Sequence, residues 1–481
     1  MQRDLGALTA REHDLLVIGG GIYGAMAAWD AAQRGLSVAL VEAADFGSGA
    51  SWNSLKTIHG GLRDLQRADF LQARESVRER RAFLRIAPRL VRPLPFVVPT
   101  YGHGLRGRAV LGFGLRLYDL VAADRNDELP PEAHLPPSGV LSSAEMLELF
   151  PGLPVRGLNG GARWVDAQVS SSERLLVSVV HAACELGARV ATRAEVIGLR
   201  TEGGRVRGAV VRDHEGQSDV EVRARMTLSA AGSLEAIARL AGIRAPAVAM
   251  VSGLNLVLWR PLTSGHALGM LSGGRFLFAV PWRDRGLVGT AYGSVHPPAP
   301  RAQAEAFLQE AATAYPWAGL TPADVAAVHH GLVPGDPTGL RSRPILLDHQ
   351  THHGVAGLVS IQGVKYTGSR RLAEQAVDRV CARLGRKAAP CRTAVTVLAA
   401  ASPLPGSLEE QARRAVREEM ALHLDDAVLR RLDLGTGGQA EPADVATVAR
   451  VMAEELGWTR GRCSAEEDAL ARALPYAAIP G

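Results

Sequence analysis

The sequence predicts an α/β protein whose first domain is a dinucleotide-binding Rossmann domain. Three observations support this prediction. Residues 14–42 read as strand, glycine turn, helix and strand; residues 357–384 read as a second strand, glycine turn and helix; and the chain beyond residue 400 changes to a helical pattern. A chain of 481 residues is long enough for two or three domains with cores of their own.

The first glycine turn follows a short apolar run, Leu15 to Ile18, and precedes an alanine-rich segment at 22–34 that favours a helix. A second apolar strand, 36–41, ends at an acid, Glu42. Three glycines fall in the G-x-G-x-x-G register: Gly19, Gly21 and Gly24. They permit, in turn, a tight turn, approach of a pyrophosphate to the backbone, and close packing of helix on strand. The helix N-terminus can hold phosphates and Glu42 can accept hydrogen bonds from a ribose, so the unit predicts an adenine dinucleotide site.

The second glycine turn favours a flavin over a nicotinamide. Gly363 follows the strand at 357–361, and Lys365 stands just before a helix at 367–384. The pyrimidine edge of a flavin gains negative charge on reduction, and a helix N-terminus with a lysine would stabilise that charge. A strand at 226–231 that ends at Gly232 suits a chain returning to the dinucleotide. An ordinary βα unit at 357–384 remains the alternative to this FAD prediction.

The remaining pattern places helices at 69–86 and 170–186, the first with a solvated face of arginines. We expect β-strands at 94–99, 189–200, 206–213, 220–225, 251–259, 275–280 and 286–290, the last three in a second layer. Residues 101–120 combine leucines, Phe113 and arginines. This composition suits either a segment on anionic lipid or a helix half-buried in the domain, and we favour the helix.

Composition excludes several classes. Four cysteines without a C-x-x-C pair argue against a disulfide scaffold or a structural zinc site. We expect no bound metal, because the pairs His329-His330 and His352-His353 lack acidic or thiolate ligands at a fixed spacing and read as exposed loops. No apolar signal segment and no run of eighteen apolar residues is visible. Scattered arginines account for the net charge of +5, so we expect no nucleic-acid partner.

Several longer segments resemble the FAD-dependent glycerol-3-phosphate dehydrogenases, members of the D-amino-acid-oxidase-like flavoprotein superfamily. The likeness starts at SLKTIHGGLR, residues 54–63, and spans nearly the whole chain. It continues through residues 70–99, RWVDAQ at 163–168, VPWRDRGLVGTAYG at 280–293, and the helix that follows Gly363. The resemblance implies a glutathione-reductase-type FAD-binding Rossmann domain, a mixed β-sheet substrate domain and a small C-terminal helical domain.

The resemblance also implies residue roles and boundaries. The expected catalytic residues are Arg63, Lys365, His59 and Asn255. The expected cofactor-binding residues are Gly19, Gly21, Gly24, Glu42, Ser54, Lys56, Gly232, Gly363, Lys365 and Thr367. The oxidoreductase domain would span 1–400, with FAD-binding segments at about 14–90, 170–245 and 340–390 and substrate-domain segments at about 91–169 and 246–339. The helical cap would span 401–481.

Three positions depart from the family pattern, and all three concern the substrate. Asp64 stands where the family has tyrosine, Asn255 where it has histidine, and Val333 where it has an arginine. Valine cannot replace the two parallel hydrogen bonds of an arginine to phosphate. Either Arg341 or Arg343 could supply the missing guanidinium, although each reads more simply as a surface arginine.

The resulting prediction is an FAD-dependent enzyme that oxidises a secondary alcohol, either glycerol 3-phosphate to dihydroxyacetone phosphate or a related hydroxylated small molecule. Oxidation of an amine or another alcohol, or a catalytically weak flavin-bearing partner subunit, remain alternatives. Quinone or oxygen is the expected electron acceptor. We expect a cytoplasmic protein; a peripheral contact with the inner face of the cell membrane and a homodimer stay open.

Overall fold

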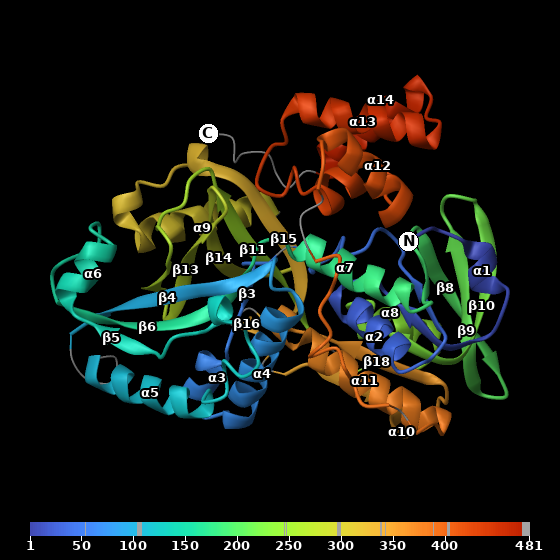
Figure 1. The fold of residues 1–481 in the computed structure, drawn as a ribbon, viewed down its shortest axis with the longest axis horizontal. Coiled ribbons are helices and arrows are strands. Elements are labelled where there is room, and N and C mark those ends of the chain that lie inside the picture. The colour runs from blue at the N-terminus through green and yellow to red at the C-terminus, as the bar shows by residue number, and fades with distance from the viewer. Residues whose placement is uncertain are drawn as a thin grey trace.

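Two β-sheets and a set of C-terminal helices make up the molecule (Figure 1). This computed structural model describes residues 1–52, 54–102, 108–244, 246, 248–295, 300–336, 339–341, 343–387, 389–401 and 405–473. The first sheet and its helices lie on the right of Figure 1, the second sheet on the left, and α12–α14 above both. Within the described residues, no helix is long and apolar enough to cross a membrane.

The first sheet has eight strands and carries the glycine turn. Its main path runs β17 (Ile345–Asp348), β18 (Leu358–Gln362), β10 (Ser218–Ser229), β1 (His13–Ile18), β2 (Val38–Val41), β7 (Arg189–Ala191), and all of these neighbours are parallel except β17. β8 (Ala194–Glu202) and β9 (Arg205–Asp213) extend β10 as an antiparallel ribbon. The chain passes from β1 to β2 on one side of β1, whereas the strand on its other side, β10, comes later in the sequence. The strand order therefore reverses at β1, and a ligand crevice is expected at its carboxyl end.

Helices cover both faces of this sheet, as a buried parallel sheet requires. Leu15 and Val17 face a core built with α2 (Ile22–Gln33), α7 (Ser172–Glu185) and α11 (Ser369–Leu384). Leu16 and Ile18 face the opposite way, into a core with α1 (Leu5–Thr9), α8 (Leu234–Leu240) and the β8–β9 ribbon. The unbroken apolar run of β1 therefore serves two cores at once.

The second sheet has ten strands and is mixed. Its order is β16 (Gly339–Leu340), β15 (Val325–Asp336), β11 (Met250–Leu258), β14 (Arg285–Gly293), β13 (Arg275–Trp282), β12 (Ala267–Ser272), β4 (Val91–Tyr101), β6 (Leu158–Val169), β3 (Thr57–Ile58), with β5 (Gly139–Leu141) beside β6. The contact between β4 and β12 is parallel and the others are antiparallel. One face packs on α6 (Ser143–Leu149) and α9 (Pro300–Ala314).

The other face of the second sheet meets the segment that follows the glycine turn. Leu55 and Leu62 pack there against a core of apolar side chains from β4, β6, β13 and β15. α3 (Leu62–Gln66), α4 (Phe70–Ile86) and α5 (Arg108–Val121) lie below this sheet in Figure 1. β3 itself belongs to the second sheet, so the IHGGLR segment runs between the two sheets.

The C-terminal helices have a core of their own. α12 (Leu408–Glu419), the π-helical turn η5 (Asp426–Arg431), α13 (Pro442–Leu456) and α14 (Arg460–Ala473) enclose buried apolar residues such as Leu424, Val448 and Met452. α12 begins with a capping box, in which Ser407 and Glu410 satisfy each other's backbone N–H groups. The helical pattern beyond residue 400 is therefore confirmed.

Some predicted elements were wrong. The predicted strand 189–200 is two strands, because the chain turns at Thr192–Arg193, where Arg193 has a φ of 52°. The predicted strands 220–225 and 226–231 are one long strand, β10. The arginines of α4 are also not a free solvated face, since Arg74 and Arg81 both pair with Asp124.

Candidate functional site

The glycine turn has the geometry that its sequence predicts. Gly19 has a φ of 104°, a backbone conformation that favours glycine, and its N–H donates to Val41 O at 2.8 Å. A Cβ on Gly24 would lie 1.9 Å from Gly19 O, so only glycine lets α2 pack this closely. A Cβ on Gly21 would instead meet only Ser51 Oγ, at 3.1 Å. The space beside Gly21, at the N-terminus of α2, is open enough for a phosphate to approach.

Residues 43–51, which we call the cofactor loop, close around this turn. Glu42 is partly buried and accepts hydrogen bonds from Gly20 N at 2.6 Å and Ala44 N at 2.9 Å. Burial raises the pKa of its carboxyl group, while these two hydrogen bonds act in the opposite direction. Ser51 Oγ accepts from Ile22 N at 3.0 Å. The loop thus fixes the acid that the sequence assigns to the ribose.

The IHGGLR segment is held by a buried carboxylate, Asp166. Its oxygens accept from Gly60 N at 2.8 Å and from Arg80 Nη1 at 2.6 Å, and lie 3.2 Å from His59 Nδ1. Burial alone would raise the pKa of Asp166, but the hydrogen bond from His59 and the charge of Arg80 lower it to about 2. Asp166 therefore remains a carboxylate and orients His59, whose side chain is 47% exposed.

The two glycines of this segment permit close contact with α4 and α5. A Cβ on Gly60 would lie 2.2 Å from Arg80 Nη1, and one on Gly61 would lie 2.8 Å from the α4 backbone at Ala73. Tyr118 of α5 donates its hydroxyl to Gly60 O at 3.0 Å. The double glycine thus positions His59 and the residues that follow it.

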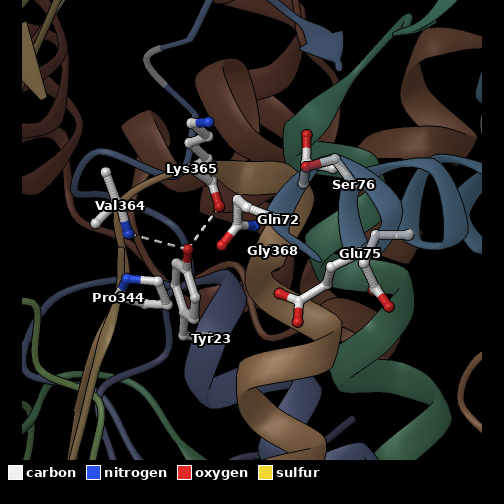
Figure 2. Close-up of a pocket in the computed structure, with 10 residues that line it drawn as sticks. Tyr23, Gln72, Glu75, Ser76, Pro344, Val364, Lys365 and Gly368 are labelled. Atoms are coloured by element: carbon white, nitrogen blue, oxygen red, sulfur yellow. Dashed lines mark hydrogen bonds between the residues drawn. The ribbon is translucent and has the colours of Figure 1, made fainter. Parts of the chain in front are cut away.

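The second glycine turn is stabilised by Tyr23, the second residue of α2. The Tyr23 hydroxyl donates to Lys365 O at 2.5 Å and accepts from Val364 N at 3.1 Å (Figure 2). A Cβ on Gly363 would lie 1.8 Å from the Tyr23 ring, so glycine is required there by the tyrosine. This region borders a shallow, solvent-open pocket whose other side is lined by Gln72, Glu75 and Ser76 of α4 (Figure 2).

The structure brings His59 and Asp64, on either side of the segment that contains Arg63, against the turn at Lys365. His59 N donates to Thr367 Oγ1 at 3.1 Å, which ties the IHGGLR segment to η4 (Tyr366–Gly368) across 308 residues of sequence. Lys365 Nζ lies 3.0 Å and 3.2 Å from the two oxygens of Asp64, with 34% of the lysine side chain and 8% of the aspartate side chain exposed. The first departure from the family pattern is thus an acid paired with the lysine expected at the flavin edge.

Lys56 has a different environment from the one its motif suggested. Its ammonium is fully buried and contacts Glu173 at 2.5 Å, Ser172 Oγ at 2.8 Å and Trp52 O at 2.8 Å. The side chain therefore fastens the start of α7 to the IHGGLR segment. Ser54 Oγ accepts from Lys56 N at 3.2 Å, so it stabilises the local backbone. Gly232 O accepts from Gln362 Nε2 at 2.9 Å and connects the ends of β10 and β18.

The other two departures lie on neighbouring strands of the second sheet: Asn255 is on β11 opposite His329, and Val333 is on β15 opposite Val251. Asn255 is buried, and its Oδ1 accepts from Thr290 Oγ1 at 2.7 Å. A Cβ on Gly253 would lie 3.5 Å from Val333 Cγ2 and 3.9 Å from Thr290 Cγ2. Val333 and Thr290 thus flank Gly253, and Asn255 is hydrogen-bonded to the same threonine. The position expected to carry an arginine is apolar here.

The positive charge of Arg63 influences the pKa of Tyr292 of β14. Burial raises the pKa of Tyr292, and the charge of Arg63 and a hydrogen bond with Thr290 oppose that rise. The two arginines considered as substitutes for the missing guanidinium both lie at the surface: Arg343 forms an ion pair with Asp69 at 2.8 Å, and Arg341 is exposed. Within the described part of the chain, neither arginine side chain forms a hydrogen bond with Val333 or Asn255.

His329 corrects one prediction from sequence. It was expected in an exposed loop, but it lies in β15, directly across from Asn255, and is fully buried. Its ring stands 5.5 Å from Trp52 and 6.1 Å from Trp282, and its Nε2 lies 2.7 Å from Thr436 O. Burial lowers its pKa to about 3, and the charge of Lys56 contributes in the same direction. His349 is also buried, beside Ser360.

Sequence reasoning singled out neither Asp166, Arg80, Tyr23 nor Tyr292 as a site residue. Asp166 and Tyr292 lay inside segments that carried the family likeness, and no local pattern distinguished them. Arg80 lay among the arginines of a predicted solvated face, yet it is fully buried. A buried arginine can be recognised only once its partner, 86 residues further on, is known.

Comparison with known proteins places this geometry in a family. The model described as "FAD dependent oxidoreductase" matches residues 14–368, and the model described as "C-terminal domain of alpha-glycerophosphate oxidase" matches residues 361–463. The glycerol-3-phosphate dehydrogenase of Mycobacterium leprae is 32% identical over 93% of this chain and 86% of its own length. The chain belongs to the glycerol-3-phosphate dehydrogenase family of FAD-dependent oxidoreductases. It is an enzyme that acts on CH–OH donors with FAD as its cofactor.

Solved structures of this family share the fold. The glycerol-3-phosphate dehydrogenase of Bacillus halodurans, solved in complex with FAD, aligns with a TM-score of 0.75 at 23% identity, covering 99% of this chain and 97% of that one. The L-alpha-glycerophosphate oxidase of Mycoplasma pneumoniae aligns with a TM-score of 0.59 at 16% identity, covering 82% of this chain and all of that one. The glutathione-reductase-type FAD fold with a helical C-terminal domain is thereby confirmed.

The residues at the two glycine turns of this protein fit FAD. The open space beside Gly21 at the start of α2 suits a pyrophosphate, and Glu42 lies directly after the neighbouring strand β2. Lys365 and the backbone of Val364 lie at the second turn, where a flavin edge is expected.

Proposed function

We propose that this enzyme oxidises the secondary alcohol of a small hydroxylated molecule to a ketone, with glycerol 3-phosphate as the first candidate and dihydroxyacetone phosphate as its product. The proposal depends on one observation above the others: the hydrogen bond from His59 N to Thr367 Oγ1, which ties His59 to the Lys365 turn. This arrangement puts a proton acceptor and the Lys365–Asp64 pair beside the expected flavin edge.

We assign the residues the following roles. FAD, when bound, supplies the acceptor for the hydride that leaves the alcohol carbon. His59, with Nδ1 directed at Asp166, accepts the hydroxyl proton at Nε2. Lys365 stabilises negative charge at the flavin edge, and Arg63 holds the anionic end of the substrate. Asn255 cannot take up a proton, so it serves to orient the substrate.

The cofactor side of the proposal assigns the two glycine turns to the two ends of FAD. Gly19, Gly21 and Gly24 with Glu42 would hold the adenosine and pyrophosphate, and the turn from Gly363 to Thr367 would hold the flavin. Strand membership supports the domain division: the first sheet takes its strands from residues 13–41, 189–229 and 345–362, and the second from 57–58, 91–169 and 250–340.

Anaerobic reduction of the bound flavin tests the function. The holoenzyme is mixed with glycerol 3-phosphate, glycerol, a 2-hydroxy acid and an amine, and loss of the oxidised flavin band is followed. We expect the band to fade with at least one of the three hydroxylated compounds: glycerol 3-phosphate, glycerol or the 2-hydroxy acid. Bleaching by the amine alone would replace this proposal with amine oxidation, and no bleaching by any of them would favour a catalytically weak partner subunit.

Electron acceptor and location are further parts of the proposal. We assign quinone or oxygen as acceptor, in a cytoplasmic enzyme that touches the inner face of the membrane. α5 supports this contact: Leu115 and Tyr118 are buried, whereas Phe113 is 71% and Leu120 is 74% exposed, with Phe70 and Leu71 of α4 also exposed. Loss of vesicle binding in Phe113→Ser would support the contact. A homodimer stays a prediction that sedimentation can decide.

A further inference from the structure

The cofactor loop contacts the first glycine turn along its length. The ring of Phe46 lies over Gly20, where an added Cβ would come within 2.7 Å of its Cδ1. Gly47 N donates to Gly20 O at 3.1 Å, and Ala44 N donates to Glu42 Oε1 at 2.9 Å. Any movement of this loop therefore moves the turn and the acid that face the adenosine end of FAD.

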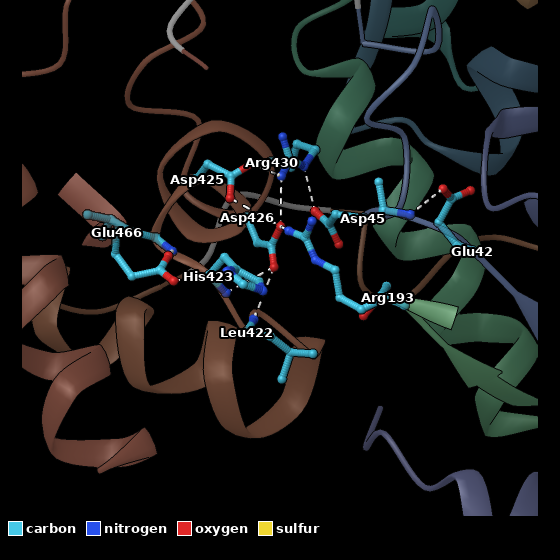
Figure 3. A network of polar contacts seen from close by, with 12 residues as sticks. Glu42, Asp45, Arg193, Leu422, His423, Asp425, Asp426, Arg430 and Glu466 are labelled. Carbon is cyan, nitrogen blue, oxygen red and sulfur yellow. Dashed lines mark hydrogen bonds and ion pairs between the residues drawn. The ribbon is translucent and has the colours of Figure 1, made fainter. Parts of the chain in front are cut away.

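The loop is fastened to the C-terminal domain through Asp45. Its carboxylate is fully buried and receives a two-pronged contact from Arg431, with Nη1 at 2.8 Å and Nη2 at 2.7 Å. Arg430 Nε donates to the same carboxylate at 2.5 Å (Figure 3). Both arginines come from η5, some 385 residues further along the chain. These contacts hold the pKa of Asp45 well below its usual range, because the two guanidinium charges outweigh the effect of burial.

A third arginine closes the network. Arg193 Nη2 lies 2.6 Å from Asp426 Oδ1, and Arg430 Nη2 lies 2.7 Å from the same oxygen. Arg430 also contacts Asp425 at 2.7 Å. The backbone N–H of Arg193 donates to Ala44 O at 2.9 Å, so this arginine too contacts the cofactor loop. The cluster balances three guanidinium groups against three carboxylates: Arg193, Arg430, Arg431, Asp45, Asp425 and Asp426.

We propose that Arg430 and Arg431 are positioning residues for FAD: docking of the C-terminal helical domain holds the cofactor loop closed on the first glycine turn. A buried carboxylate without its partners is costly, so Asp45 would turn to water if η5 moved away, and Phe46 would leave Gly20. Coupling of this kind is reciprocal, so bound FAD also strengthens the docking of η5. The inference depends on the cofactor and not on the substrate proposed above.

Variants of Arg431 test the proposal directly. Arg431→Met should raise the dissociation constant for FAD by about tenfold or more, because Asp45 loses its two-pronged partner. Arg431→Lys keeps the charge without the fork and should recover part of that affinity. FAD binding is measured by titrating the apoprotein and following flavin fluorescence, and FAD release by dilution of the holoenzyme.

The matched control is Arg174→Met. Arg174 forms a similarly buried two-pronged pair with the carboxylate of Glu419 of α12, at 2.8 Å and 2.7 Å, and so joins the C-terminal domain to α7. The backbone carbonyl of Glu419 accepts from Arg431 Nε at 2.9 Å, a contact that the substitution of Arg174 leaves in place. We expect this variant to bind FAD within about twofold of the parent. Parent-like affinity in Arg431→Met would overturn the proposal, and so would an equal loss in Arg174→Met.

A second measurement needs no substitution and remains decisive if Arg431→Met does not fold. The parent protein is freed of FAD, and amide hydrogen exchange is compared before and after FAD is restored. We expect FAD to slow exchange in 426–431 at least threefold, while exchange in 448–452, in the core of α13, stays unchanged. Equal exchange of 426–431 with and without FAD would overturn the coupling.

Discussion

The Asp64–Lys365 pair offers a test at the scale of single residues. Asp64→Asn should raise the reduction potential of the bound flavin and tighten binding of sulfite, because Lys365 would keep its charge without a neutralising partner and would stabilise the anionic forms of the flavin. Lys365→Met should do the opposite. Both are measured by equilibration with a reference dye and by sulfite titration. Asp219→Asn is the control, since Asp219 pairs with the exposed Arg212 on the β9–β10 ribbon.

Val333 and Asn255 give a second prediction at this scale, on substrate preference. We expect slow turnover of glycerol 3-phosphate, because Val333 offers no hydrogen bond to a phosphate and Asn255 is already bonded to Thr290. Val333→Arg combined with Asn255→His should raise kcat/KM for this substrate by about a hundredfold. The melting temperature is measured alongside, because a buried arginine without a partner is destabilising. Fast turnover by the parent would contradict this alignment of the site.

Some of these residues could be placed from sequence and others could not, for a physical reason. Gly19, Gly24 and Glu42 act through neighbours within 30 residues, so their spacing was informative. Three other ion pairs each join residues more than 80 positions apart: Lys56 with Glu173, Asp64 with Lys365, and Asp166 with Arg80. Such pairs follow from the packing of two sheets, which no local pattern records.

At the scale of elements, the first βαβ unit separates fold from cofactor binding. Gly24→Ala should destabilise the protein, because its Cβ would overlap Gly19 O at 1.9 Å. Gly21→Ala should fold nearly as well as the parent, since its Cβ meets only Ser51 Oγ, but should bind FAD weakly because the methyl group faces the pyrophosphate. Melting of the two apoproteins and FAD titration separate the effects. Equal FAD affinity in Gly21→Ala and the parent would place the pyrophosphate elsewhere.

Element boundaries were predictable where one neighbour dictates them and not where a strand changes partners. α4 begins after its cap at Asp69 and ends at Ile86, as the pattern predicts. β10 was read as two strands because its first half, paired with β9, alternates polar and apolar residues, whereas its end, paired with β1 and β18, is continuously buried from Met226 to Ser229. The change of pattern marks a change of environment within one strand.

At the scale of the whole molecule, the C-terminal domain contacts both halves of the enzyme. η5 fastens the cofactor loop, and the backbone carbonyl of Thr436 accepts a hydrogen bond from His329, which lies in β15 of the second sheet, opposite Asn255 of β11. The sequence predicted the helices of this domain but neither contact, because each joins residues more than 100 positions apart. Both contacts involve buried ionisable groups, so docking of the domain should depend on pH.

His329 should make the stability of the folded enzyme depend on pH. It has a pKa of about 3 in the folded protein, against 6.5 ordinarily, because burial disfavours its charged form. The unfolded chain therefore binds one more proton than the folded chain between these values, and stability falls as pH drops through that window. His329→Gln should remove this contribution. Its loss of stability between about pH 7 and about pH 5, measured by urea unfolding, should be smaller than the parent's by about 2 kcal/mol.

His349, with a folded pKa of about 4, acts in the same direction in parent and variant alike, so the difference isolates His329. His214→Gln, at an exposed pair with Glu195, serves as the control and should leave the parent's slope unchanged. Equal slopes in His329→Gln and the parent would mean that His329 is charged, or solvated, in the folded enzyme.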